Sequence, residues 1–316
     1  MACTDRHDRY FLRQITPHSL LYTEMLTEGA LLNGDAKRLL AFNARERPLA
    51  VQLGGSTPES LGKCARLAES FAYDEVNLNV GCPSPRVKSG RFGACLMAEP
   101  ALVAECIISM KESTRLPVTV KSRIGIDNLD SFEHLHQFVS TVVAAGCSTL
   151  IVHARKAWLT GLSPKDNRTL PPLHYERVYR LKSEFPSLEV VINGGVRSSD
   201  DVRQHLSCVD GVMIGREAYS NPYCLASLDC EIFGARSQPP SRHDVVRSMF
   251  PYIESQLREG VRLARISRHM LGLFQGIPGA KAWRRYISEH AHSRDAGITT
   301  MHEALRQVPE EYATEH

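Results

Sequence analysis

The alternation of short β-branched segments with longer segments of helical periodicity is the feature that most constrains the fold of this 316-residue chain. Strands are expected at 20–25, 49–53, 75–79, 118–121, 150–153, 190–193 and 211–214. Helices are expected between them at 58–72, 100–114, 131–145, 175–184 and 198–206. Strand–helix–strand repeats at this spacing form right-handed units that build a parallel sheet. The sequence therefore predicts an α/β fold, and we expect a (β/α)8 TIM barrel.

An eight-stranded barrel needs one strand more than these seven. Residues 4–16 favour a helix that begins at Thr4, because apolar residues recur at Tyr10, Phe11 and Ile15. We therefore expect the first strand of the barrel to be missing from this chain, with roughly ten to twenty residues absent from the true start. The alternatives are a strand elsewhere that the pattern does not reveal, or an open sheet.

The last quarter of the chain differs from the rest. The Gly/Pro/Ser-rich segment 234–241 is typical of a linker, and 243–312 has helical patterning without strand signals. We expect a catalytic barrel at 1–233 and a helical domain at 242–316. Between 242 and 285 there are nine Lys/Arg and three Asp/Glu, a net charge of +6, which leaves −3 elsewhere because the whole chain is +3. Such a segment is either a solvated helix face or a surface that binds a polyanion.

The composition excludes several classes of protein. No run approaches the roughly 18 apolar residues of a membrane span, and the polar N-terminus lacks the apolar core of a secretory signal. The nine cysteines lack CxxC spacing, which predicts reduced thiols rather than disulfides or a metal site. We expect a cytoplasmic protein without a membrane partner or a metal.

The strongest local signal follows the third predicted strand, where Asn79-Val-Gly81-Cys82-Pro83 turns the chain over the expected barrel mouth. A thiol with an ordinary pKa near 8.5 stays protonated at neutral pH and can act as a general acid. The flanking Gly and Pro set its orientation and favour a catalytic role for Cys82. The alternative is a buried loop cysteine, which is the interpretation we give to most of the other cysteines.

Polar residues also end three other predicted strands: Gln52, Lys121 and His153. The carboxyl ends of barrel strands converge on one face, so these side chains are expected to share one space. Lys121 is compatible with two chemistries. It can form a Schiff base, as in an aldolase, or it can act as a permanent cation that stabilises the anionic edge of a reduced flavin.

The loops after the last two predicted strands carry Asn193-Gly194-Gly195 and Gly215-Arg216. Barrels commonly bind a phosphate there, because backbone N–H groups at glycine turns and a helix N-terminus face the anion. Arg216 would add charge. The alternative is a pair of structural turns.

Together these segments resemble the tRNA-dihydrouridine synthase family. The resemblance runs from about residue 5 to residue 288 and is carried by NLNVGCPSPRVKSGRFGACLM (77–97), TVKSRIGID (119–127), IVHARKAWLTGLSPKDNR (151–168), VINGGV (191–196), DGVMIGREAYSNP (210–222) and LGLFQGIPGAKAWRRYIS (271–288). Within segment 151–168, the part that begins at His153 resembles in particular the subfamily that acts at positions 20 and 20a of the tRNA D-loop.

The resemblance implies a TIM barrel that holds FMN, a helical tRNA-binding domain, NADPH as electron donor, and no protein partner, so we expect a monomer. It implies that Cys82 is the proton donor and that Asn79 contacts the target uracil. The implied flavin ligands are Gln52, Lys121, His153, Asn193, Gly194, Gly195, Gly215 and Arg216. The implied tRNA contacts are Arg155, Lys156, Arg284 and Arg285. The chain departs from the family at its start, where the first strand with its Pro-Met pair against the flavin is expected.

Two other functions compete with this interpretation. One is a flavin-dependent barrel oxidoreductase that acts on a free pyrimidine or an enone, although the basic segment 242–285 argues against a small free substrate. The other is a tRNA-binding protein that is inactive because the first strand is absent.

Overall fold

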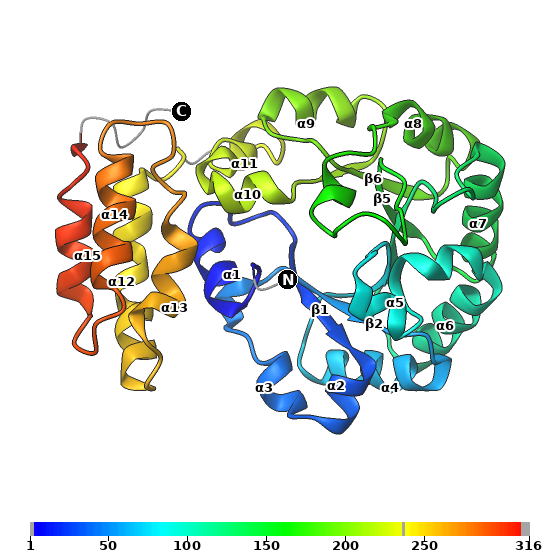
Figure 1. Cartoon of the computed structure of the whole chain (residues 1–316), viewed down its shortest axis with the longest axis horizontal. Helices are drawn as coiled ribbons and strands as arrows, with labels where there is room; N and C mark the ends of the chain where they lie inside the picture. The colour runs from blue at the N-terminus through cyan, green and yellow to red at the C-terminus, as the bar shows by residue number, and fades with distance from the viewer. Residues whose placement is uncertain (1–2, 236–237, 311–316) are drawn as a thin grey trace.

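The computed structural model describes residues 3–235 and 238–310. Seven parallel strands form one sheet in simple sequential order (Figure 1). They are β1 (Leu21–Thr27), β2 (Leu49–Gly54), β3 (Glu75–Val80), β4 (Val118–Arg123), β5 (Thr149–His153), β6 (Glu189–Asn193) and β7 (Gly211–Met213). Each coincides with a strand predicted from the sequence. The sheet curls as in a TIM barrel, and β1 and β7 are its two edges.

The predicted helices are present on the outside of the curled sheet: α4 (Pro58–Ser70), α6 (Pro100–Ser113), α7 (Phe132–Ala144), α8 (Tyr175–Glu184) and α9 (Ser199–Leu206). Local chemistry fixes where they begin. The Ser131 hydroxyl accepts from the backbone N–H of His134 at the start of α7, and Ser198 forms a capping box with Asp201 at α9. α4 and α6 each begin with a proline, which has no N–H to leave unpaired.

Shorter helices fill the connections that the periodicity did not resolve. Two follow β1, one follows the Cys82 loop, and two lie after β7: α2 (Glu28–Asn33), α3 (Ala36–Leu40), α5 (Pro85–Ser89), α10 (Arg216–Ser220) and α11 (Leu228–Glu231). They have at most six residues, too few for a 3.6-residue period to stand out in the sequence.

The first helix, α1 (Arg6–Arg13), corrects one expectation. Its N-cap is Asp5 and not Thr4, because the Asp5 carboxylate accepts from the backbone N–H groups of His7 and Asp8. The helix lies between the barrel and the C-terminal helices (Figure 1). The Tyr10 ring stacks on Tyr252 with centroids 3.9 Å apart, and His7 Nδ1 lies 2.7 Å from the Tyr252 hydroxyl.

The C-terminal region is a bundle of α12 (Arg242–Arg258), α13 (Leu263–Ser267), α14 (Ala280–His290) and α15 (Ile298–Leu305). Trp283 is completely buried at its centre, and its indole N–H donates to the Met270 carbonyl. The helical patterning expected over 243–312 is therefore present in four helices, the last of which ends at Leu305. Residues 311–312, and residues 236–237 of the predicted linker, lie outside the described part.

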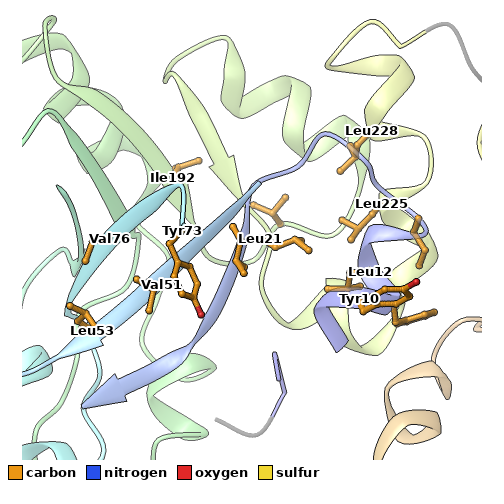
Figure 2. Close-up of a cluster of buried hydrophobic side chains, with 14 of the residues drawn as sticks. Tyr10, Leu12, Leu21, Val51, Leu53, Tyr73, Val76, Ile192, Leu225 and Leu228 are labelled. Atoms are coloured by element: carbon orange, nitrogen blue, oxygen red, sulfur yellow. The ribbon is translucent and has the colours of Figure 1, made fainter. Parts of the chain in front are cut away.

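Buried apolar side chains run continuously from the sheet to α1 (Figure 2). Val51 and Leu53 of β2 pack in this core with Leu21 of β1. Tyr10 and Leu12 of α1 belong to the same core, as do Leu225 and Leu228 in the segment after β7. The bundle therefore contacts the barrel through α1, a largely buried helix. Across the described residues, every helix is too short or too polar to cross a membrane.

Candidate active site at the carboxyl end of the sheet

The Cys82 loop is held in place from both sides. Asn79 lies near the end of β3, and its Oδ1 accepts from the backbone N–H groups of Gly81 (3.1 Å) and Cys82 (3.0 Å). The Cys82 carbonyl accepts from Ala94 N at 2.9 Å. Gly93 has φ +73°, and a Cβ there would lie 2.7 Å from the Cys82 carbonyl oxygen, so glycine is required for this approach.

Cys82 itself is partly exposed, whereas Cys64, Cys106 and Cys147 are buried. Burial raises the pKa of the Cys147 thiol to about 11. Those three thiols behave as small apolar side chains in the core. Cys95, Cys208 and Cys224 are free thiols as well.

The structure brings Gln52 to Asn79 and Lys121 to Asn193. The Asn79 amide donates to Gln52 Oε1 at 2.8 Å, and Lys121 Nζ donates to Asn193 Oδ1 at 3.2 Å. Burial, together with a smaller effect of the nearby Arg123, lowers the pKa of Lys121 to about 8. Side chains from β2, β3, β4 and β6 thus meet at one end of the sheet, as the strand-end argument predicts.

His153 ends β5 and is a neutral imidazole. Burial is the largest cause of its very low pKa, and four cations add to the effect: Arg123, Lys121, Arg155 and Arg216. The side chain is 9% exposed. So many positive charges around one neutral ring mark a place where an anion is stabilised.

The glycine turn after β6 closes against this ring. Gly194 has φ +115°, and a Cβ on it would lie 2.7 Å from His153 Cδ2. Gly195 follows with φ +80°, and the Tyr175 hydroxyl donates to the Gly194 carbonyl at 2.7 Å. The turn therefore needs glycine for backbone conformation and for close packing. Gly215 caps α10, and the exposed Arg216 donates from Nη2 to the Arg168 carbonyl at 3.0 Å.

The residues expected to contact tRNA fall in two places. Arg155 donates to the Pro171 carbonyl, and Lys156 forms an ion pair with Asp130 at 2.8 Å. Lys156 Nζ also lies 4.1 Å from the centre of the Trp158 ring, beside a cavity of about 410 Å³. Arg284 and Arg285 are exposed on α14 of the bundle, away from the strand ends.

Arg123 is a site residue that the sequence did not single out. It is 4% exposed, and it donates from Nε to the Gly81 carbonyl (3.1 Å) and from Nη1 to the Asn167 carbonyl (3.0 Å). It thereby joins the Cys82 loop to the loop after β5. Burial lowers its pKa to about 10, so it stays charged at neutral pH. The available signal was its position two residues after Lys121, which places both on the same face of β4.

A curled parallel sheet with a partly exposed thiol, a neutral imidazole and buried cations at the carboxyl ends of its strands has the layout of an α/β-barrel enzyme with an anion-binding active site. Comparison with known proteins is more specific. The chain belongs to the dihydrouridine synthase family, whose sequence profile matches residues 1–309. Members of this family are oxidoreductases.

The chain is similar to several bacterial proteins named tRNA-dihydrouridine(20/20a) synthase. It is 57% identical over 309 residues to the Vibrio parahaemolyticus protein, covering 98% of this chain and 94% of that protein. It is 56% identical over 306 residues to the Escherichia coli K12 protein, covering 96% and 88% respectively. For the Synechocystis protein the identity is 55% over 306 residues, with 97% and 92% covered.

Proposed function

We propose that this chain reduces uridine to 5,6-dihydrouridine at positions 20 and 20a of the tRNA D-loop, with FMN as the bound cofactor and NADPH as the electron donor. The observation that carries the proposal is the partly exposed Cys82 thiol, held on its loop close to Lys121 and Arg123. The names of the relatives at 55–57% identity support the two positions.

The residues at the strand ends fit a flavin phosphate and an anionic ring edge. The four charges that lower the pKa of His153 are all positive, and the Gly194-Gly195 turn packs against His153 and Tyr175 so closely that only glycine fits there. Asn193, Gly215 and Arg216 would complete the phosphate side, while Gln52 and Lys121 would face the ring. Reduced FMN, when bound there, would supply a hydride for C6 of uracil. Membership of the family favours the cation role of Lys121 over a Schiff base.

Cys82 supplies the proton. When C6 of uracil gains a hydride, the electron pair of the C5=C6 bond moves toward C4 and O4 as an enolate. The S–H bond of Cys82 then breaks, its proton forms the new C5–H bond, and a thiolate remains. Asn79 uses one amide N–H for Gln52, so its second N–H is available to hold the ring and stabilise the developing charge.

The bundle supplies the surface for tRNA. The target base must leave its stack to reach the barrel mouth, which costs a few kcal/mol, and phosphate contacts offset this cost. Arg284 and Arg285 are exposed on α14 and are available for such contacts. We assign catalysis to a barrel domain at 1–233 and tRNA binding to a helical domain at 242–316, acting as a monomer in the cytoplasm. Arg155 and Lys156 would contact the nucleotide nearer the mouth.

The test is Cys82→Ala, with Cys95→Ala as a matched control because Cys95 is also a partly exposed thiol. Each protein is expressed in a host that lacks dihydrouridine synthases, and tRNA nucleosides are measured by mass spectrometry. We expect Cys82→Ala to bind flavin and tRNA normally but to form dihydrouridine at least about a hundredfold more slowly, the contribution of a positioned acid. Near-normal turnover would remove Cys82 from this role. If the original protein reduces free uracil but not uridine in tRNA, tRNA is not its substrate.

A further inference from the structure

The interior of the barrel is polar on the side of β3. Barrel interiors are usually filled by branched apolar side chains. Here the inward-facing residues of β3 are Glu75, Asn77 and Asn79, which are 9%, 0% and 8% exposed. In the strand register, Gln52 of β2 and Thr119 of β4 lie on either side of Asn77.

These five side chains form one continuous series of hydrogen bonds, which we term the Glu75 chain. Asn79 Nδ2 donates to Gln52 Oε1 at 2.8 Å, and Gln52 Nε2 donates to Asn77 Oδ1 at 2.9 Å. Asn77 Nδ2 donates to Thr119 Oγ1 at 2.8 Å. The Thr119 hydroxyl then donates to Glu75 Oε1 at 2.6 Å.

The direction of the Glu75 chain is fixed at both ends. Backbone N–H groups can only donate, so the bonds from Gly81 and Cys82 require Asn79 Oδ1 to be the acceptor. A carboxylate can only accept, so Glu75 requires the Thr119 hydroxyl to donate. Rotating any amide between these ends would place donor against donor or acceptor against acceptor. Each carboxamide therefore has a single orientation.

At the far end of the Glu75 chain, the Glu75 carboxylate accepts two hydrogen bonds. The Tyr22 hydroxyl also donates to Glu75 Oε1, at 2.7 Å. Burial raises the pKa of Glu75, and the hydrogen bonds from Thr119 and Tyr22 oppose that rise. A buried carboxylate without such bonds would be costly, so its presence in a barrel interior calls for a function.

We propose that Glu75 is a positioning residue for uridine reduction, which acts through Thr119, Asn77 and Gln52 to hold the Asn79 carboxamide, and with it the Cys82 loop, in place. This inference rests on the proposed function. Asn79 is the connecting residue, because its oxygen holds the loop while its amide faces Gln52. Glu75 itself needs no contact with substrate.

The test interrupts the Glu75 chain at the buried side chain of Thr119, which is 1% exposed. Thr119→Val keeps the shape but removes the hydroxyl, and Thr119→Ser restores it. Thr16→Val is the control, because Thr16 is also fully buried and its hydroxyl donates to a carboxylate, Asp229, at 3.3 Å outside the Glu75 chain. Two quantities are compared, the hydrogen-exchange rate of the Gly81 and Cys82 amides and kcat for tRNA, and KM is measured alongside.

We expect Thr119→Val to accelerate exchange of both amides by about tenfold and to lower kcat by about tenfold at unchanged KM, the effect of one buried hydrogen bond. Thr119→Ser should return both quantities to within about threefold of the original protein, and Thr16→Val should change neither. If Thr119→Val does not fold, Thr119→Ala carries the same expectations.

Three results would overturn the inference. Unchanged amide exchange in Thr119→Val would show that the Glu75 chain does not hold the Cys82 loop. Faster exchange with unchanged kcat would remove its role in the reaction. If Thr119→Ser does not restore the amide exchange rate and kcat, the effect of Thr119→Val comes from altered packing and not from the lost hydroxyl. Because amide exchange needs neither cofactor nor turnover, failure here is distinct from a normal rate in Cys82→Ala, which would refute the proposed function instead.

Discussion

Lys121 offers a prediction about stability that follows from its burial. Its pKa falls from 10.5 to about 8, chiefly because the ammonium group loses water and also because Arg123 is near. At 1.36 kcal/mol per pKa unit, this corresponds to about 3 kcal/mol of penalty for the charged form in the folded protein. The penalty is complete below pH 8, where Lys121 is charged both folded and unfolded. It disappears as pH rises to 10.5, where the unfolded chain also loses the proton.

Lys121→Met removes this titration while keeping the length of the side chain. Asn193 Oδ1 loses a donor in the variant, but that loss does not depend on pH. The free energy of unfolding of each protein without cofactor is measured in urea by circular dichroism from pH 7 to 10.5. We expect the original protein to gain about 3 kcal/mol relative to Lys121→Met over this range. Parallel pH profiles for the two proteins would refute the reasoning.

The same titration predicts how the cofactor binds. An anionic flavin favours the charged form of Lys121, so FMN affinity should fall by up to about tenfold per pH unit above pH 8. Lys121→Met should bind FMN weakly and without this pH dependence. Fluorescence titration of FMN across the same pH range measures the effect, and an equal slope in both proteins would contradict it.

Two further predictions concern the glycine turn and the bundle. Gly194→Ala should lower the free energy of unfolding by about 1–3 kcal/mol, because φ is +115° and the new Cβ would meet His153 at 2.7 Å; a loss below about 0.5 kcal/mol in urea would argue against strain there. Arg284→Ala combined with Arg285→Ala should weaken tRNA binding and reduce the slope of log Kd against log salt by up to about two, measured by filter binding. An unchanged slope would mean that these arginines do not contact phosphate.

The helices and strands were predictable because their signals are local. The seven strands and the five longer helices of the barrel lie where β-branched runs, prolines and Ser caps placed them. The cap of α1 was placed one residue too early. Thr4 and Asp5 are both N-cap residue types, and only the backbone geometry shows that the Asp5 carboxylate reaches the N–H groups of His7 and Asp8.

The site was predictable in part. Strand ends gave the shared location of Gln52, Lys121 and His153, because parallel strands must converge at one face. Arg123 was missed, since a charged residue near a strand end in the sequence is most often solvated. Its burial, and its bonds to the Gly81 and Asn167 carbonyls, depend on two loops that are distant in the sequence.

The sequence by itself determined the order of elements, the glycine turns and the placement of Cys82 on a loop, because periodicity and backbone preference act over a few residues. Only the tertiary structure decided which side chains are partners. Thr119 and Glu75 are 44 residues apart and look like ordinary strand residues, yet the register of β3 with β4 makes them the end of one hydrogen-bond chain. Hydrogen bonds are short and directional, so pairings of this kind exist only once the strands are aligned.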